Sequence, residues 1–289
     1  MKVIGINVLS LFDGISCGKV ALERANIKVD TYYASEVNSY AIQISKKNYP
    51  QIKQLGDILN WREWNLDWSK IDLLIGGSPC QGFTFAGKML NFEDPRSKLF
   101  FEYVDILNHI KKVNPNIKFL LENVKMKKEY ENIITDYMEV NPLKINSNLV
   151  SAQNRQRLYW TNTTNIQQPQ DKGILLKDIV RKEDNSQYHL SVKHLQGFLR
   201  SYNWKPSLLD GKAKPILASY YKQPPHCPYI PCNESESGYR MLSPIEAERC
   251  QTLPDNYTEG ISKCQRYKCI GNGWTVDIIV YILSCIFKD

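Results

Sequence analysis

Apolar runs of strand length alternate with helix-period segments up to about Trp160. Ile6–Leu11, Ile71–Ile75 and Phe119–Val124 are largely apolar, and small or polar residues follow the first two runs. This alternation predicts an α/β fold, with a mostly parallel sheet and helices on both faces. After Thr161 the pattern degrades into polar sequence with many Pro, Tyr and Lys residues, which predicts a smaller, irregular second domain.

The helix-period segments predict the remaining elements. Helices are expected over 19–25, 38–48, 97–112 and 128–138. An apolar helix over 275–287 would dock onto the first domain, which is therefore expected to be discontinuous. Ser243 followed by Pro244 predicts a helix start with Ser243 as the cap.

Composition limits the class of protein. The chain has 289 residues, of which 43% are hydrophobic, enough for one large core and a smaller satellite core. It contains no run of eighteen apolar residues and no signal-peptide pattern, so we expect a soluble, cytoplasmic protein without a membrane partner. The eight cysteines are scattered, which favours a thiol protein over a disulfide framework.

The charge favours a polyanionic partner. The net charge is +7, and the segment from Thr161 to Tyr239 carries ten basic and seven acidic residues. This excess suggests phosphate contacts that weaken as salt rises. His226, Cys227 and Cys232 lie close together, but they lack a second paired cluster at zinc-finger spacing, so no metal is expected.

Cys80 is the strongest candidate for chemistry. It follows the apolar run Ile71–Ile75 and the turn Gly76-Gly77-Ser78-Pro79, which would present its sulfur at the carboxyl edge of the sheet, where open α/β folds bind ligands. The alternative is a small buried apolar side chain. The motifs described next favour a nucleophilic role for Cys80.

A nucleotide-binding corner lies near the N-terminus. The strand Ile6–Leu11 runs into Phe12-Asp13-Gly14 and then a helical pattern, without the glycine or lysine loop that a phosphate requires. Glu36 ends the next strand, where an acidic residue grips ribose hydroxyls, and Asp57 follows a third turn. These turns therefore predict a cofactor that contains adenosine with free ribose hydroxyls and no phosphate, as S-adenosylmethionine does.

Two further segments carry polar groups. Glu122 ends the strand Phe119–Leu121, and if the strands are parallel it shares the sheet edge with Cys80. A partly desolvated glutamate can hold a proton near neutral pH, and an acid beside a thiol suits attack on an electron-poor ring. Arg155 and Arg157 alternate in a strand-like segment, so both are expected on one face, as a solvated surface or as donors to a phosphate or carbonyl.

In this order the motifs resemble the DNA (cytosine-5) methyltransferases, and the match runs through most of the chain. Ala34–Val37 and Val150–Ala152 also resemble the de novo branch of the animal enzymes, whereas Pro79–Phe83 is similar to bacterial and phage enzymes, which we favour. The matching segments are Phe12–Gly14, Glu36, Asp57, Pro79–Gln81, Glu122–Val124, Gln153–Arg157, Arg240–Arg249 and Gly271–Gly273.

The resemblance implies the Rossmann-like fold of S-adenosylmethionine-dependent methyltransferases. It implies a catalytic and cofactor-binding domain over 1–163 and 265–289, and a target-recognition domain over 164–264 with a bracing segment over 240–254. The cofactor residues carried over are Phe12, Asp13, Gly14, Glu36, Val37, Asp57, Ile58, Pro79, Leu99, Asn272 and Trp274.

Two positions depart from the family pattern. Many relatives carry an aromatic residue where this chain has Val37, which puts the stacking role of that position in doubt. Trp274 follows Gly273 as in the animal de novo branch, and it either lines the cofactor pocket or packs the last helix.

The resemblance also implies a mechanism. Cys80 would attack C6 of a flipped-out cytosine while Glu122 protonates or hydrogen-bonds N3. Arg157 would polarise the O2 carbonyl, Arg155 would help to orient the base, and Asn123 would shape the pocket. Gln81 and Arg96 belong to a flexible basic segment that could close over DNA, with Arg96 on a phosphate.

The resemblance implies double-stranded DNA as the partner, bound by a monomer, and a cognate restriction endonuclease encoded nearby. A relative that methylates tRNA uses the same chemistry and is the alternative. A thymidylate synthase-type enzyme also uses a Pro-Cys dipeptide, but the Phe12–Gly14 corner and the second domain argue against it. A DNA-binding protein that has lost catalysis is disfavoured by intact Cys80 and Glu122.

Overall fold

The structure, a computed structural model, describes residues 5–79, 95–182, 185–201 and 203–288, without the side chains of 95–97 and 201. It divides into two compact units. Unit 1 comprises Met1–Ile145, Gln156–Gln168 and Ile279–Asp289, and unit 2 comprises Asn146–Arg155 and Pro169–Ile278. The functional domain limits drawn from the sequence stay a prediction.

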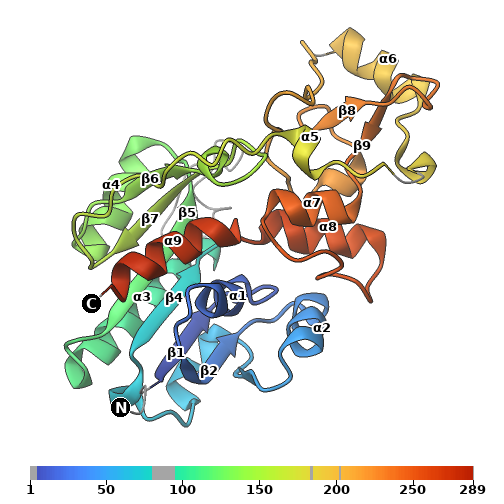
Figure 1. Ribbon diagram of the computed structural model, residues 1–289. Coiled ribbons are helices and arrows are strands. Elements are labelled where there is room, and N and C mark those ends of the chain that lie inside the picture. Colours follow the sequence, from blue (N-terminus) through green and yellow to red (C-terminus); the bar gives the residue numbers. More distant parts are fainter. Residues whose placement is uncertain (1–4, 80–94, 183–184, 202, 289) are drawn as a thin grey trace. The chain divides into compact units, whose positions relative to one another are not determined.

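Unit 1 contains a seven-stranded sheet with the order β3-β2-β1-β4-β5-β7-β6 (Figure 1). β1 pairs in parallel with β2 and β4, β2 with β3, and β4 with β5, whereas β5 and β7 are antiparallel. The mostly parallel sheet predicted from the apolar runs is therefore confirmed. The strands are β1 (Ile6–Leu11), β2 (Val29–Ser35), β3 (Lys53–Gln54), β4 (Leu73–Gly77), β5 (Lys118–Val124), β6 (Leu143–Asn146) and β7 (Gln156–Thr161).

Helices cover both faces of this sheet. Because β1 leads towards β2 and β4 leads towards β5 in opposite directions, right-handed crossovers place α1 and α3 on opposite faces. α3 and α4 bury Phe100, Tyr103 and Ile134 against Leu74 and Phe119 of the sheet, while α1 and α9 lie on the other side (Figure 1). The helices are α1 (Cys17–Arg24), α2 (Ser39–Asn48), α3 (Pro95–Val113), α4 (Lys128–Met138) and α9 (Val276–Ile286).

Close packing around β4 requires a glycine at position 76. A Cβ on Gly76 would lie 3.0 Å from the Leu11 carbonyl oxygen and 3.0 Å from Cε2 of Tyr103. Both neighbours are fully buried, so neither has room to move. Gly76 therefore lets β4, β1 and α3 pack together just before the turn that leads to Cys80.

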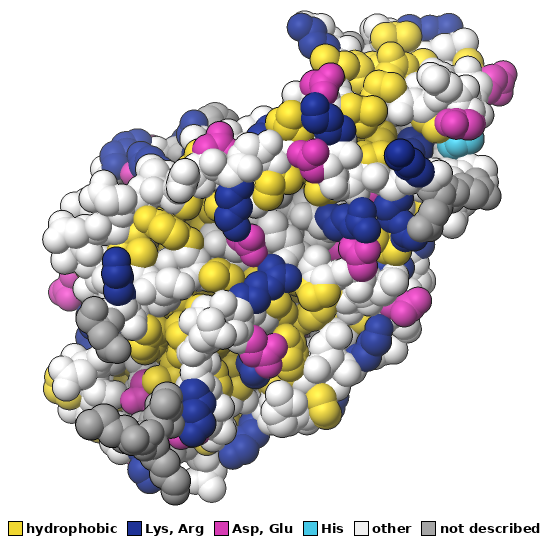
Figure 2. Space-filling view, viewed as in Figure 1, with side chains coloured by type: hydrophobic (Ala, Val, Ile, Leu, Met, Phe, Trp, Pro, Cys, Tyr) yellow, Lys and Arg dark blue, Asp and Glu magenta, His cyan; other side chains and the backbone are white. Residues whose placement is uncertain are grey.

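Unit 2 is mostly irregular, as the sequence predicts. Its aromatic core includes Tyr220, Tyr229 and Tyr267, which are almost fully buried. Figure 2 shows hydrophobic side chains at the surface near α6, with Lys and Arg side chains at the margin. The regular elements are α5 (Leu176–Ile179), α6 (Val192–Ser201), β8 (Tyr229–Pro231), β9 (Tyr239–Met241), α7 (Pro244–Cys250) and α8 (Lys263–Asn272).

A buried ion pair holds the segment 240–254 in unit 2. Arg240 donates through both terminal nitrogens to the Glu246 carboxylate, each at 2.7 Å, and the two side chains are 4% and 0% exposed. Ser243 caps α7 by accepting the Glu246 backbone N–H, while Glu246 accepts the Ser243 N–H. The predicted helix start at Ser243-Pro244 is therefore confirmed as a capping box.

One helical run in the described part of the chain, Lys263–Ile286, could cross a membrane by length and composition alone. However, 61% of its most apolar window is buried inside the protein. α8 ends at Asn272 and α9 begins at Val276, so the run is two helices. Burial of this kind is what a core helix of a soluble protein shows.

Candidate active site

The first turn after β1 has an unusual backbone. Phe12, Gly14 and Ser16 all have positive φ, at 56°, 58° and 59°. Left-handed φ is uncommon for residues other than glycine and is a marked outlier for a bulky side chain such as Phe12. Strain of this kind concentrates at functional sites, because the surrounding structure must hold it in place.

Asp13 fixes this turn from inside the protein. Its carboxylate accepts hydrogen bonds from the Ser16 hydroxyl at 2.5 Å and the Tyr32 hydroxyl at 2.7 Å. Burial raises the pKa of Asp13 to about 6, against the opposing effect of the hydroxyl donors, and the nearby Glu36 charge adds to the rise. The Asp13 side chain thus supports the turn, and Tyr32, which the sequence analysis did not single out, is its partner.

Glu36 lies directly beside this turn. Its Oε2 accepts the Gly14 N–H at 2.8 Å, and its Oε1 accepts the N–H groups of Val37 and Asn38, each at 2.8 Å. The carboxylate is therefore held in one orientation by three backbone donors. The apolar side chain of Val37 next to it is 68% exposed.

The third turn also presents a carboxylate and an apolar side chain. Gly56 has φ 79°, and Asp57 caps the short helix η1 (Ile58–Glu63) by accepting the Leu59 N–H at 3.0 Å. Ile58 is 4% exposed and packs in the core, whereas Leu59 is 43% exposed. The exposed apolar side chain of this turn is therefore Leu59, whereas Ile58, the predicted cofactor residue, faces the core.

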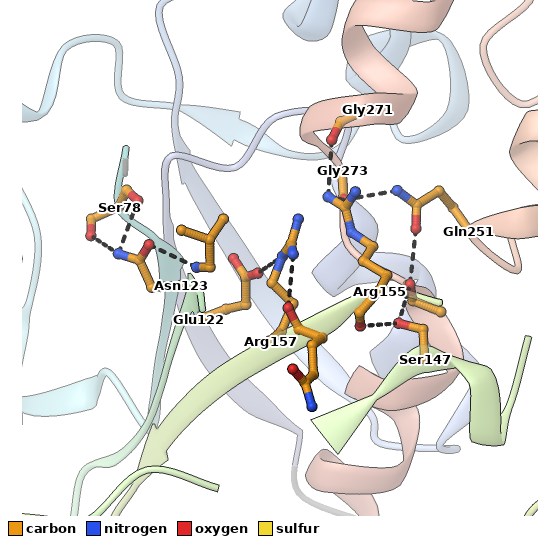
Figure 3. Close-up of polar contacts among 12 residues, drawn as sticks. Ser78, Glu122, Asn123, Ser147, Arg155, Arg157, Gln251, Gly271 and Gly273 are labelled. Atoms are coloured by element: carbon orange, nitrogen blue, oxygen red, sulfur yellow. Dashed lines mark hydrogen bonds and ion pairs between the residues drawn. The ribbon is translucent and has the colours of Figure 1, made fainter. Parts of the chain in front are cut away.

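The register of β4 and β5 positions Glu122. The two strands are parallel, and Gly77 pairs with Glu122. The neighbouring Asn123 is 1% exposed and donates to the Ser78 hydroxyl at 3.1 Å and, more weakly, to the Ser78 carbonyl at 3.4 Å (Figure 3). Its own Oδ1 accepts the Val124 N–H at 2.8 Å. Asn123 therefore ties the end of β5 to the turn after β4, a role that the sequence did not reveal.

Glu122 forms an ion pair with Arg157. Nε of Arg157 lies 2.9 Å from Oε1 of Glu122, and the two side chains are only 15% and 12% exposed. The antiparallel pairing of β5 and β7 brings them together. Val124 pairs with Arg157, and Glu122 lies two residues before Val124, on the same face of β5. In Figure 3 the two charged groups point toward one another from neighbouring strands. An acid and a planar guanidinium are thus held side by side.

Arg155 has different partners from Arg157. β7 begins at Gln156, so Arg157 lies in the strand and Arg155 lies just before it, and the strand expected to hold both arginines starts later than predicted. The Arg155 guanidinium is buried and donates to the carbonyls of Ile216, Gly271 and Gly273 at 2.8, 2.9 and 3.1 Å (Figure 3). The fixed fork of guanidinium donors matches these three carbonyl acceptors, which compensates for burial of the charge.

The other predicted site residues differ in how they are placed. Leu99 on α3 is half-buried against the core of unit 1. In unit 2, Asn272 is exposed at the end of α8 and Trp274 is half-buried. Pro79 is half-buried, whereas Cys80, Gln81 and the side chain of Arg96 lie outside the described residues.

Residues 6–288 match the family model described as C-5 cytosine-specific DNA methylase. The chain is 30% identical to the type II methyltransferase M1.ScrFI of Lactococcus lactis subsp. cremoris, over 96% of this chain and 77% of the relative. It is 28% identical to the type II methyltransferase M.NlaX of Neisseria lactamica, over 94% and 93%. The structure superposes on S. pombe Dnmt2 methyltransferase with a TM-score of 0.77 at 20% identity, covering 96% and 97%.

The family model spans nearly the whole chain, including both units. The likeness to Dnmt2 confirms the predicted Rossmann-like methyltransferase fold. The protein therefore belongs to the C-5 cytosine-specific DNA methylase family.

Proposed function

We propose that this protein is a DNA (cytosine-5) methyltransferase that acts on a specific duplex sequence with S-adenosylmethionine as methyl donor. The family and the names of its relatives support this activity. The observation that carries the proposal is the Glu122–Arg157 pair, held at the sheet edge where β4 leads through Pro79 to Cys80.

The geometry of this pair matches one edge of cytosine. N3 and the O2 carbonyl are adjacent on the ring, so the base needs an acid and a planar cation side by side. In its protonated form Glu122 would hydrogen-bond or protonate N3, and Arg157 would polarise O2. The two side chains lie 2.9 Å apart before the base arrives. Two groups held in advance by neighbouring strands cost little reorganisation when the base enters.

Cys80 supplies the nucleophile in this proposal. Its thiolate adds to C6 of the flipped base, and the negative charge that would develop on the ring is drained through Glu122 and Arg157, which leaves C5 electron-rich. Once C5 carries the methyl group, loss of the C5 proton and elimination of the Cys80 thiolate restore the aromatic ring. Asn123 positions the turn that carries Cys80 through its hydrogen bonds to Ser78, and the Pro79 carbonyl is the proposed acceptor for the exocyclic amine.

The residues of unit 1 fit S-adenosylmethionine, which when bound supplies an electrophilic methyl group. Glu36 presents a fixed carboxylate to the ribose hydroxyls, and the strained Phe12–Gly14 turn places its backbone beside that carboxylate. Val37 and Leu59 are apolar yet exposed, as surfaces that contact an adenine ring would be before it binds. Asp57 borders the same region at the start of η1. In unit 2, Asn272 and Trp274 are proposed contacts.

The proposed partners and location follow from the relatives. Two of them are named type II methyltransferases, which points to a restriction-modification setting with a cognate endonuclease. We propose a monomer that works in the cytoplasm of a bacterial or phage-infected cell.

The activity is tested by methyl transfer to duplex DNA and to tRNA, followed by bisulfite sequencing of DNA from cells that express the protein. We expect 5-methylcytosine in one sequence context. Activity on tRNA alone would refute the choice of DNA.

The nucleophile is tested with Cys80→Ser, which should abolish turnover but leave DNA binding intact. Cys264→Ser, which changes a half-buried thiol on α8, is the matched control and should retain activity. Wild-type protein should form a covalent complex with 5-fluorocytosine DNA, and the Cys80→Ser protein should not. A Cys80→Ser protein that still methylates would remove this residue from the mechanism.

A further inference from the structure

Unit 2 contains a cavity that the motifs do not explain. Its volume is about 330 Å³, and Asn203, Trp204, Lys214, Pro225 and His226 line it. This volume lies at the lower end of the range for pockets that bind small organic groups, roughly 300–1,000 Å³. The lining combines an aromatic ring, a cation, an imidazole and an amide, a mixture that suits a ligand with a flat polar ring and a negative charge.

Trp204 forms a rigid wall of this cavity. Its ring meets that of Tyr239 edge-on at 5.0 Å and lies 5.9 Å from Phe198 and 6.2 Å from Tyr229. These contacts hold the indole in place, while the side chain as a whole is only half-buried. A fixed, partly open aromatic ring offers a stacking or edge contact to a base at little entropic cost.

The cavity lies in the most basic stretch of unit 2. Residues 192–226 contain six Lys or Arg residues and one acidic residue, Asp210, so most of the basic excess of the wider segment 161–239 lies here. Asp210 is already paired with Lys177 at 3.0 Å, which lies outside the stretch. Lys212 is used internally, since it donates to the carbonyls of Asn148, Ser151 and Ile174.

Lys214 is the cation at the cavity. Its Nζ donates to the Lys205 carbonyl at 2.6 Å, and no carboxylate of the described residues forms an ion pair with it. Burial lowers the pKa of Lys214. A partly desolvated ammonium whose partner is neutral gains more electrostatic binding energy from an incoming phosphate than a fully hydrated surface lysine does.

We propose that this cavity receives a nucleotide of the target DNA other than the methylated cytosine and reads part of the recognition sequence. Lys214 and His226 would contact the backbone phosphate, and Asn203 and Trp204 would contact the base. An amide can pair with a base edge through two hydrogen bonds, which discriminates between bases, whereas a lysine–phosphate contact adds affinity without sequence information. The inference rests on the proposed DNA methylation and assigns sequence reading to particular residues.

Two variants separate these roles. Asn203→Ala should relax the sequence preference at one base pair by about tenfold, measured as kcat/KM on duplexes changed at each position around the cytosine. Lys214→Gln should weaken binding to all duplexes alike and reduce the slope of log K against log salt by about one. Lys193→Gln is the control. Lys193 is exposed on α6, and its substitution removes the same charge from the same stretch.

The outcomes distinguish this inference from the proposed function. If wild-type protein methylates duplex DNA but Asn203→Ala keeps the full sequence preference and Lys214→Gln behaves as Lys193→Gln does, the cavity reads no nucleotide. If wild-type protein neither binds nor methylates duplex DNA, the proposed function and this inference are both wrong. Circular dichroism checks that each variant is folded, and Asn203 and Lys214 are replaced without touching the buried aromatic cluster.

Discussion

Asp13 makes a quantitative prediction about stability and pH. Its pKa is raised from 3.8 to about 6 in the folded protein because the carboxyl is buried. The folded state therefore binds this proton more tightly than the unfolded state, and stability falls as pH rises through this range. A shift of about two pKa units corresponds to about 3 kcal/mol once the group is fully ionised.

Replacement by asparagine removes this titration. The amide of Asp13→Asn keeps the size of the side chain, and the hydroxyls of Ser16 and Tyr32 can accept as well as donate hydrogen bonds. Any hydrogen-bond loss is the same at every pH. The stability of Asp13→Asn relative to wild type should therefore rise by about 1.5 kcal/mol between pH 5 and pH 8.

The assay is urea unfolding followed by tryptophan fluorescence and circular dichroism, without cofactor, at several pH values. Asp136→Asn, at an exposed position on α4, is the control and should track wild type. A constant difference between Asp13→Asn and wild type from pH 5 to pH 8 would show that the buried carboxyl is not held protonated, and the reasoning would fail.

Three other substitutions test the supporting structure. Arg240→Ala should lower the free energy of unfolding by about 3–5 kcal/mol, because it leaves Glu246 charged and buried; urea titration measures this, and a loss below 1 kcal/mol would contradict the assigned burial. Ser243→Ala should cost about 1 kcal/mol through loss of the α7 cap, seen in the same titration, and an unchanged midpoint would argue against the cap. Asn123→Ala should lower kcat for methyl transfer more than it raises KM for DNA, because Ser78 loses its tie to β5; a normal kcat would exclude that positioning role.

Arg155 shows what sequence reasoning about the site did not reveal. Alternation predicted that Arg155 and Arg157 share one face, but it indicated no partner for either guanidinium, and the strand begins one residue after Arg155. The three carbonyls that Arg155 binds lie 61 to 118 residues away in the sequence. No local sequence pattern indicates such distant partners. Arg155 is therefore either a residue that orients the base or one that holds the segments of these three carbonyls together.

Glu122 shows the opposite case. Its place at the end of an apolar run, and the expectation of parallel strands, predicted that it shares an edge with the turn before Cys80. The pairing of Gly77 with Glu122 confirms this for the described part of that turn. Local burial patterns sufficed here because parallel strands align their carboxyl ends at one edge.

The sequence by itself determined the main parallel strands of the sheet, the helices of unit 1, the family and the cap at Ser243. Each of these depends on residues close together in the chain, where apolar period, turn chemistry and motif spacing act directly. Only the tertiary structure decided the partners of Arg157 and Arg155, the support of the first turn by Tyr32, and the cavity at Trp204. Those contacts depend on strand order, register and packing, which join residues far apart in the sequence and leave no local signal.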